Sequence, residues 1–286
     1  MPLSPRSGGS RSRWLGLAVL TLPVVLTSMD ITILHIAIPT ITRELAPGPS
    51  QTLWILDAYG FLLAGLLIVM GNVGDRIGRR RLLVVGAGLF GAASTLAPFA
   101  PSPEVLIAAR ALMGTGGATL MPSTLSLIRN MFTDPAERTR AIGVWTASLS
   151  GGIALGPIVG GLLLEAFWWG SVFLINVPVV GLLLAIAPRL VPEFKNPVTA
   201  RLDLLSVVLS FAAILPTVWA IKTTAEELAV TPPAAAGVGA GAIAGVVFLV
   251  RQRRLSAPLV DTGCSPTPAS AAPSSAPGWR CSRSSA

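Results

Sequence analysis

Residues 71–81 read Gly-Asn-Val-Gly-Asp-Arg-Ile-Gly-Arg-Arg-Arg, and they lie between two apolar runs that are each long enough to cross a bilayer. Acidic, basic and glycine residues are interleaved here, whereas a loop that only orients two membrane helices needs Lys or Arg in any order. Asp75 and Arg79 are four positions apart, so a helical conformation would pair them. The glycines remove side-chain bulk and let another backbone approach. The stretch therefore predicts a specific contact site, with a purely orienting basic loop as the alternative.

The composition of the chain indicates an integral membrane protein. Of its 286 residues, 52% are hydrophobic and 12% are charged, which is too apolar for a soluble domain of this size. The net charge is +8, but Lys and Arg are scattered between apolar runs, which argues against nucleic-acid binding. Cys264 and Cys281 lie in a Ser/Pro-rich tail and lack the spacing of a metal or redox site.

Eight apolar runs have about the length of a membrane-spanning helix. They cover residues 14–38, 53–72, 82–100, 104–128, 140–164, 168–188, 203–222 and 234–250. The first follows basic residues as a signal peptide does, but its length and the lack of a small-residue cleavage site predict a retained span. The last is the weakest, because it is short and consists largely of Gly and Ala.

The distribution of Lys and Arg predicts that both termini are cytoplasmic. With the N-terminus inside, the opposite side holds only Arg43 and Lys222 in its loops. We therefore expect an all-α, multi-pass protein of the cell membrane. Its predicted parts are a basic cytoplasmic N-terminal tail (1–13), a six-helix bundle (14–188), a cytoplasmic linker (189–202), two further transmembrane helices (203–250) and a cytoplasmic, disordered tail (251–286).

Three charged residues fall within predicted spans, where a charge is costly and usually faces a cavity or a partner. Counted from the outer side, Asp30 lies roughly 12 Å deep and Arg110 roughly 9 Å deep, so the two can pair directly or through water. Asp57 is near the outer start of the second span and could join them. The alternative is that each snorkels or pairs for stability alone.

A carboxylate next to an arginine in a membrane can gain and lose a proton in response to its surroundings. Burial and a nearby cation act in opposite directions on its protonation, so Asp30 can respond to solvent or to a cationic ligand. Such a site can run proton-coupled exchange with protons as the coupling ion and no other cofactor.

The fifth span contains a second glycine pattern. Gly152, Gly156 and Gly160 recur every four residues and form a flat face for close helix contact, and Gly161 follows directly. Pro157 removes a backbone hydrogen bond and bends the helix. A structural contact and a moving transporter interface are both consistent with this pattern.

Other motifs are absent or misleading. Residues 86–91 match the dinucleotide fingerprint GxGxxG, but they lie inside a membrane-length run with no strand-turn-helix unit. The sequence contains no HExxH motif, P-loop, nucleophile elbow or metal-ligand cluster. We therefore expect neither an enzyme nor a metal site.

Three motifs in order resemble those of the major facilitator superfamily. Residues 71–81 resemble its cytoplasmic loop motif between helices two and three, Leu106–Ala118 its fourth-helix motif with a membrane arginine, and Ser150–Gly161 the fifth-helix signature of its drug antiporters. Further segments are similar to the fourteen-span drug:proton antiporters, such as the quaternary-ammonium compound efflux pumps: Ser28–Pro39, Gln51–Asp57 and Phe173–Pro178.

This resemblance implies multidrug efflux by alternating access between two helical bundles, in exchange for protons, with hydrophobic or cationic compounds as substrates and drug resistance as the outcome. It implies a coupling carboxylate or cation site at Asp30 and a part in proton coupling for Arg110. It also implies a cytoplasmic gate built on residues of the 71–81 stretch: Gly71, Asp75, Arg76, Gly78 and Arg79.

The sequence departs from the family after the eighth span. We expect the second bundle to be missing, and the tail after Asp261 to derive from a frameshift. One hypothesis is therefore an efflux protein that is inactive alone. The other is a nontransporting membrane fragment or interaction module that pairs with another half, or with itself, through exposed helix faces.

Overall fold

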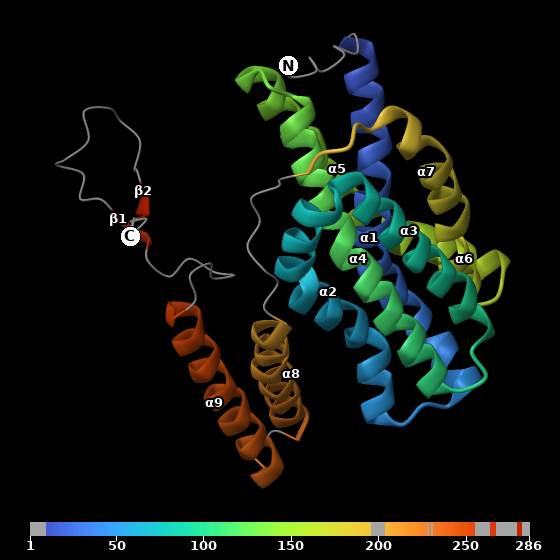
Figure 1. Cartoon of the computed structure of the whole chain (residues 1–286). Coiled ribbons are helices and arrows are strands. Elements are labelled where there is room, and N and C mark those ends of the chain that lie inside the picture. The colour runs from blue at the N-terminus through green and yellow to red at the C-terminus, as the bar shows by residue number, and fades with distance from the viewer. Residues whose placement is uncertain are drawn as a thin grey trace. The chain divides into compact units, whose positions relative to one another are not determined.

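The computed structural model describes residues 10–195, 204–227, 229, 231–254, 264–266 and 279–281. Within these residues the chain is almost entirely helical, as predicted (Figure 1). It divides into an N-terminal unit, residues 1–199, and a second unit, residues 200–286. Each unit is described separately below.

The N-terminal unit contains the six predicted spans of the bundle. Its helices are α1 (Ser10–Leu45), α2 (Pro49–Ile77), α3 (Arg79–Leu96) with the 3-10 turn η1 (Ala97–Phe99), α4 (Pro103–Met131), α5 (Pro135–Ala166), α6 (Ser171–Leu174) and α7 (Asn176–Leu190). Helices α1, α2, α4 and α5 extend beyond the predicted apolar runs at both ends, because hydropathy locates the part inside the bilayer and not the helix ends.

Proline marks the start of three of these helices. Pro49, Pro103 and Pro135 each occupy the first turn of α2, α4 and α5, where the missing N–H would have no helical partner anyway. At α5 the preceding Asp134 also caps the helix, since its Oδ2 accepts the backbone N–H of Glu137 at 2.8 Å. These starts follow from local sequence alone.

Helix α4 packs at the centre of the bundle. It contacts α1, α2, α3 and α5, and most of its length between Leu106 and Met131 is buried. The surrounding core consists of apolar side chains from every helix, including Leu20, Ile33, Ile55, Phe90, Met113, Phe173 and Leu183. Arg110 of α4 is among the largest fully buried side chains, which makes it the exceptional member of this core.

The predicted sixth span, 168–188, corresponds to the candidate membrane span Ser171–Leu190, but its helix is not continuous. It is interrupted at Ile175, between α6 and α7. Pro178 has no backbone N–H, so the carbonyl of Leu174 cannot receive the usual i+4 hydrogen bond, and the helix breaks at this turn. Asn176 follows the break and donates from Nδ2 to Ser94 Oγ of α3 at 3.3 Å.

The second unit contains α8 (Leu204–Glu227) and α9 (Pro232–Arg254), which pack against each other. A Cβ atom added at Gly241 of α9 would lie 2.8 Å from the carbonyl oxygen of Ala213 in α8, so the glycine allows this close approach. Among the described residues, seven helices are long and apolar enough to cross a membrane, and α9 is one of them. Helix α8 contributes only the shorter apolar stretch Val208–Ile221, so length does not establish the predicted seventh span.

The predicted tail 251–286 is only partly described. Helix α9 continues to Arg254, four residues beyond the predicted boundary of the last span. Two three-residue strands, β1 (Cys264–Pro266) and β2 (Trp279–Cys281), pair antiparallel, with Cys264 opposite Cys281. The expectation of a disordered tail stays a prediction. The rest of the tail and the linker residues 196–203 lie outside the described residues.

The glycine pattern of α5 faces α1 and allows the two helices to pack closely. A Cβ atom added at Gly152 would overlap Ser28 Oγ, and one at Gly156 would lie 3.0 Å from the carbonyl oxygen of Met29. Gly160 meets Ile33 in the same way, at 2.8 Å from its Cγ1. Gly161, by contrast, has open space around it. The three glycines that recur every four residues thus hold the two helices close around residues 28–33.

Substitution of Gly152 by alanine is expected to destabilise the N-terminal unit, because the added methyl group overlaps Ser28 and lies 2.7 Å from the carbonyl oxygen of Val25. We expect a loss of about 1–3 kcal/mol, measured as a lower midpoint of thermal unfolding in detergent. Gly151 is the matched control, since a Cβ atom there meets nothing within 4 Å. Equal effects of Gly151→Ala and Gly152→Ala would contradict the α1–α5 contact.

Candidate functional site

The two charged residues predicted to lie at similar depth form an ion pair. Arg110 Nη1 of α4 donates to Asp30 Oδ2 of α1, and each side chain is 1% exposed. Arg110 Nε donates a further hydrogen bond to the backbone carbonyl of Ile55 in α2, at 3.2 Å. The arginine therefore joins three helices through one guanidinium group.

An aromatic ring completes the surroundings of Arg110. The guanidinium carbon lies 4.6 Å from the ring centroid of Tyr59, in the range of a cation–π contact. The Tyr59 hydroxyl donates to the carbonyl of Thr27 in α1 at 3.0 Å. The sequence reasoning missed this residue, because a tyrosine inside an apolar span resembles an ordinary core aromatic.

Only one of the two carboxylate oxygens of Asp30 accepts a hydrogen bond among the described residues. Its Oδ2 accepts from Arg110, whereas its Oδ1 is buried and has no hydrogen-bond partner among the described residues. A buried acceptor without a partner is unfavourable, so Oδ1 is a natural position for a proton or another donor. Asp57, the third predicted residue, is half-buried on α2, two residues after Ile55. Its participation stays a prediction.

The 71–81 stretch is a junction between two helices and not a continuous helix. Helix α2 ends at Ile77 and α3 begins at Arg79, so Gly78 alone separates them. Gly78 has φ +114°, a backbone conformation that strongly favours glycine. Asp75 and Arg79 nevertheless form the predicted ion pair, at 2.6 Å between Oδ1 and Nη2.

The other residues of the stretch differ in their surroundings. A Cβ atom added at Gly74 would lie 3.0 Å from Cδ of Arg79, so this glycine makes room for the arginine side chain. Gly71 meets nothing within 4 Å. Arg76 Nε and Arg79 Nη1 are buried and have no partner among the described residues. The junction therefore carries hydrogen-bond donors that the described bundle does not use.

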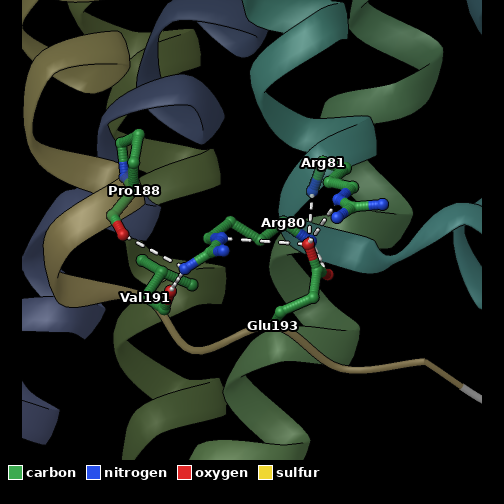
Figure 2. A network of polar contacts seen from close by, with 5 residues as sticks. All are labelled: Arg80, Arg81, Pro188, Val191 and Glu193. Carbon is green, nitrogen blue, oxygen red and sulfur yellow. Dashed lines mark hydrogen bonds and ion pairs between the residues drawn. The ribbon is translucent and has the colours of Figure 1, made fainter.

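A residue that the sequence reasoning missed holds the start of α3. Figure 2 shows the Glu193 carboxylate beside this helix start. Its Oε1 accepts the backbone N–H of Arg80 at 2.9 Å, and its Oε2 accepts that of Arg81 at 3.2 Å. The segment after α7 thus supplies the cap that the sequence around Gly78 lacks.

The last turn of α7 and the residue that follows this helix also bind a side chain from α3. Arg80 Nη1 donates to the carbonyls of Pro188 and Val191, each at 3.1 Å (Figure 2). A Cβ atom added at Gly78 would lie 2.6 Å from the carboxyl carbon of Glu193 and would displace this carboxylate, so glycine leaves room for it in addition to adopting the backbone conformation. These contacts fasten the end of α7 to the junction of α2 and α3.

A sequence profile described as the Major Facilitator Superfamily matches residues 20–277. The chain belongs to the Major Facilitator Superfamily. This assignment confirms the resemblance seen in the three sequence motifs, and it makes the chain a multi-pass membrane protein of a transporter family.

Curated members of the superfamily match most of the chain. It is 51% identical over 250 residues to the multidrug efflux pump LfrA of Mycolicibacterium smegmatis, covering 87% of this chain and 49% of LfrA. It is 39% identical over 249 residues to the methyl viologen resistance protein SmvA of Salmonella typhimurium, covering 87% of this chain and 50% of SmvA. The puromycin resistance protein pur8 of Streptomyces alboniger is 37% identical over 90% of this chain and 51% of its own length. The chain spans about half the length of these relatives.

A solved structure supports the superfamily fold. A crystal structure of the peptide transporter POT aligns with a TM-score of 0.58, at 17% sequence identity, over 77% of this chain and 54% of that chain. At this identity the likeness concerns the fold alone.

Replacing Glu193 by alanine is expected to loosen the start of α3, because the backbone N–H groups of Arg80 and Arg81 then lose their acceptors. Hydrogen exchange should become at least about tenfold faster at these two amides, which corresponds to the loss of roughly one hydrogen bond each. Glu193→Gln keeps an acceptor oxygen and should show a smaller effect. Unchanged exchange in Glu193→Ala would contradict the capping role.

Proposed function

We propose that the chain provides the proton-coupling bundle of a transporter that exports hydrophobic or cationic compounds across the cell membrane in exchange for protons. The observation that carries this proposal is the buried Asp30–Arg110 pair with its unpartnered Asp30 Oδ1. The N-terminus lies in the cytoplasm in this proposal, in keeping with the distribution of Lys and Arg.

The chemistry requires only the carboxylate and its neighbours. Asp30 can hold one positive charge beyond that of Arg110, either a proton or a cationic substrate, because one of its oxygens has no donor. Two ligands that compete for one carboxylate exchange for each other, and this competition is the basis of antiport. The exchange needs a second bundle that faces this one and lets the site open to each side in turn.

The junction of α2 and α3 acts as the cytoplasmic gate in this proposal. Asp75 and Arg79 hold each other, while Arg76 Nε and Arg79 Nη1 present buried donors without partners among the described residues. Acceptors from a facing bundle would satisfy these donors in the state closed to the cytoplasm. Opening that side would then break those hydrogen bonds.

The relatives favour export over the alternative of a nontransporting interaction module. Two of them are named for resistance to a compound, and a third is named a multidrug efflux pump. Methyl viologen, in the name of SmvA, is a dication, which agrees with a carboxylate as the substrate contact. Ethidium, a hydrophobic cation, is therefore a suitable probe.

A chimera tests the role of Asp30. Residues 1–254 joined to the part of LfrA that follows its matched region should export ethidium from cells, and an uncoupler should abolish this export. Asp30→Asn should reduce export to the level of cells without the chimera, because the neutral amide cannot bind and release a proton. Asp134→Asn is the matched control, since asparagine caps a helix as well as aspartate does. Proton-dependent export by the Asp30→Asn chimera would contradict the proposal.

The 286-residue chain expressed alone is expected to confer little or no ethidium export, because alternating access needs a second bundle. The measurement is dye loss from loaded cells with and without an uncoupler. Robust export that Asp30→Asn removes would show that the chain is competent alone, for example as a pair of copies, and a native mass measurement in detergent would then identify the pair.

A further inference from the structure

We propose that Tyr59 is a positioning residue for the ion pair: its ring face retains the Arg110 guanidinium at the site when a proton or a cationic ligand neutralises Asp30. The inference deepens the proposed function and rests on it, because it assumes the exchange at Asp30. It goes beyond that function by assigning a partner for Arg110 in the state without its carboxylate.

The need for such a partner follows from the chemistry of the two side chains. The Asp30 carboxylate can be neutralised, but an arginine side chain stays protonated in proteins. When Asp30 is neutral, Arg110 carries an uncompensated charge in a core where its side chain is 1% exposed. The described contacts of Arg110 that do not depend on the charge of Asp30 are the Ile55 carbonyl and the Tyr59 ring, and both belong to α2.

The Tyr59 ring is held beside Arg110 by burial, by a hydrogen bond and by close contacts with α4. The residue is 1% exposed, and its hydroxyl is fixed on the Thr27 carbonyl at 3.0 Å. Glycines of α4 fit around it: a Cβ atom at Gly114 would lie 3.0 Å from Tyr59 Cα, and one at Gly117 would lie 3.2 Å from its hydroxyl. Gly114 and Gly117, which follow Arg110 in the sequence, therefore leave space for Tyr59 beside this arginine.

Neutralisation of Asp30 then has a defined structural result. The contact of Arg110 with α1 weakens from an ion pair to a hydrogen bond with a neutral acceptor, whereas its contacts with α2 are kept. Arg110 stays in place to re-form the pair, and Asp30 becomes available to its new ligand. A tyrosine that only filled the core would contribute the same stability whether Asp30 is charged or neutral.

The sequence offers a direct probe, because Tyr59 is the only tyrosine in the chain. The purified full chain, grown with ring-¹³C tyrosine and held in detergent micelles, should give one set of tyrosine ring signals by NMR, all from Tyr59. Asp30→Asn represents the neutralised carboxyl group, and Arg110→Gln removes the cation. We expect the chemical shift of Asp30→Asn to stay near that of the parent and away from that of Arg110→Gln. A shift in Asp30→Asn that matches Arg110→Gln would overturn the inference.

A second measurement uses no Arg110 variant, in case that variant does not fold. Tyr59→Leu removes the ring face, and Tyr59→Phe keeps it while losing the hydroxyl. In the Asp30→Asn background, Tyr59→Leu should lower the midpoint of thermal unfolding by a few degrees more than it does in the parent, and Tyr59→Phe should avoid this extra loss. Equal losses in both backgrounds would overturn the inference. Neither measurement depends on transport, so its failure is separate from a failure of the efflux test.

Discussion

A buried arginine that cannot lose its charge is the constraint on which the N-terminal bundle depends. Removing one partner from a buried ion pair typically costs about 3–5 kcal/mol, a large part of the stability of a folded domain. Arg110 of α4 meets this constraint with groups from two other helices: the Asp30 carboxylate of α1, and the Ile55 carbonyl and Tyr59 ring of α2. The close packing of α5 against residues 28–33 holds the carboxylate within reach.

The two polar sites of the bundle are stabilised in different ways. The Asp30–Arg110 pair is fully buried, so its charges depend on each other and on the ring beside them. At the junction, the side chain of Asp75 is 30% exposed, and an ion pair of this kind contributes less to stability. The conformation of the junction is therefore stabilised mainly by the backbone hydrogen bonds of Arg80 and Arg81 to Glu193, whose carboxylate fits beside Gly78 because glycine has no side chain. Helix α2 takes part in both sites. Ile55 contacts Arg110 and Ile77 ends the helix at the junction, and about 33 Å of helix lies between these two residues.

The membrane spans and the Asp30–Arg110 ion pair could be predicted from the sequence, because each depends on a length that can be counted along the chain. Span lengths follow from the bilayer thickness, and the meeting of Asp30 and Arg110 follows from their depths along two antiparallel helices. The break at Ile175 was missed because the apolar run continues through Pro178 without a change in hydropathy. Glu193 was missed because its partners lie more than 110 residues earlier in the chain, and no local pattern connects them. Tyr59 was missed for a related reason: its orientation toward Arg110 is a tertiary property.

The junction also has a mechanical consequence. Most antiparallel membrane helices are joined by loops that can absorb a change in helix tilt, but α2 and α3 are joined by one glycine whose neighbouring amides are fixed to Glu193. A rotation of α2 therefore cannot be taken up in a connection and must also displace α3 or the segment that follows α7. In this bundle, a rearrangement that begins beside Arg110 can reach the far end of α2 without a separate signalling element.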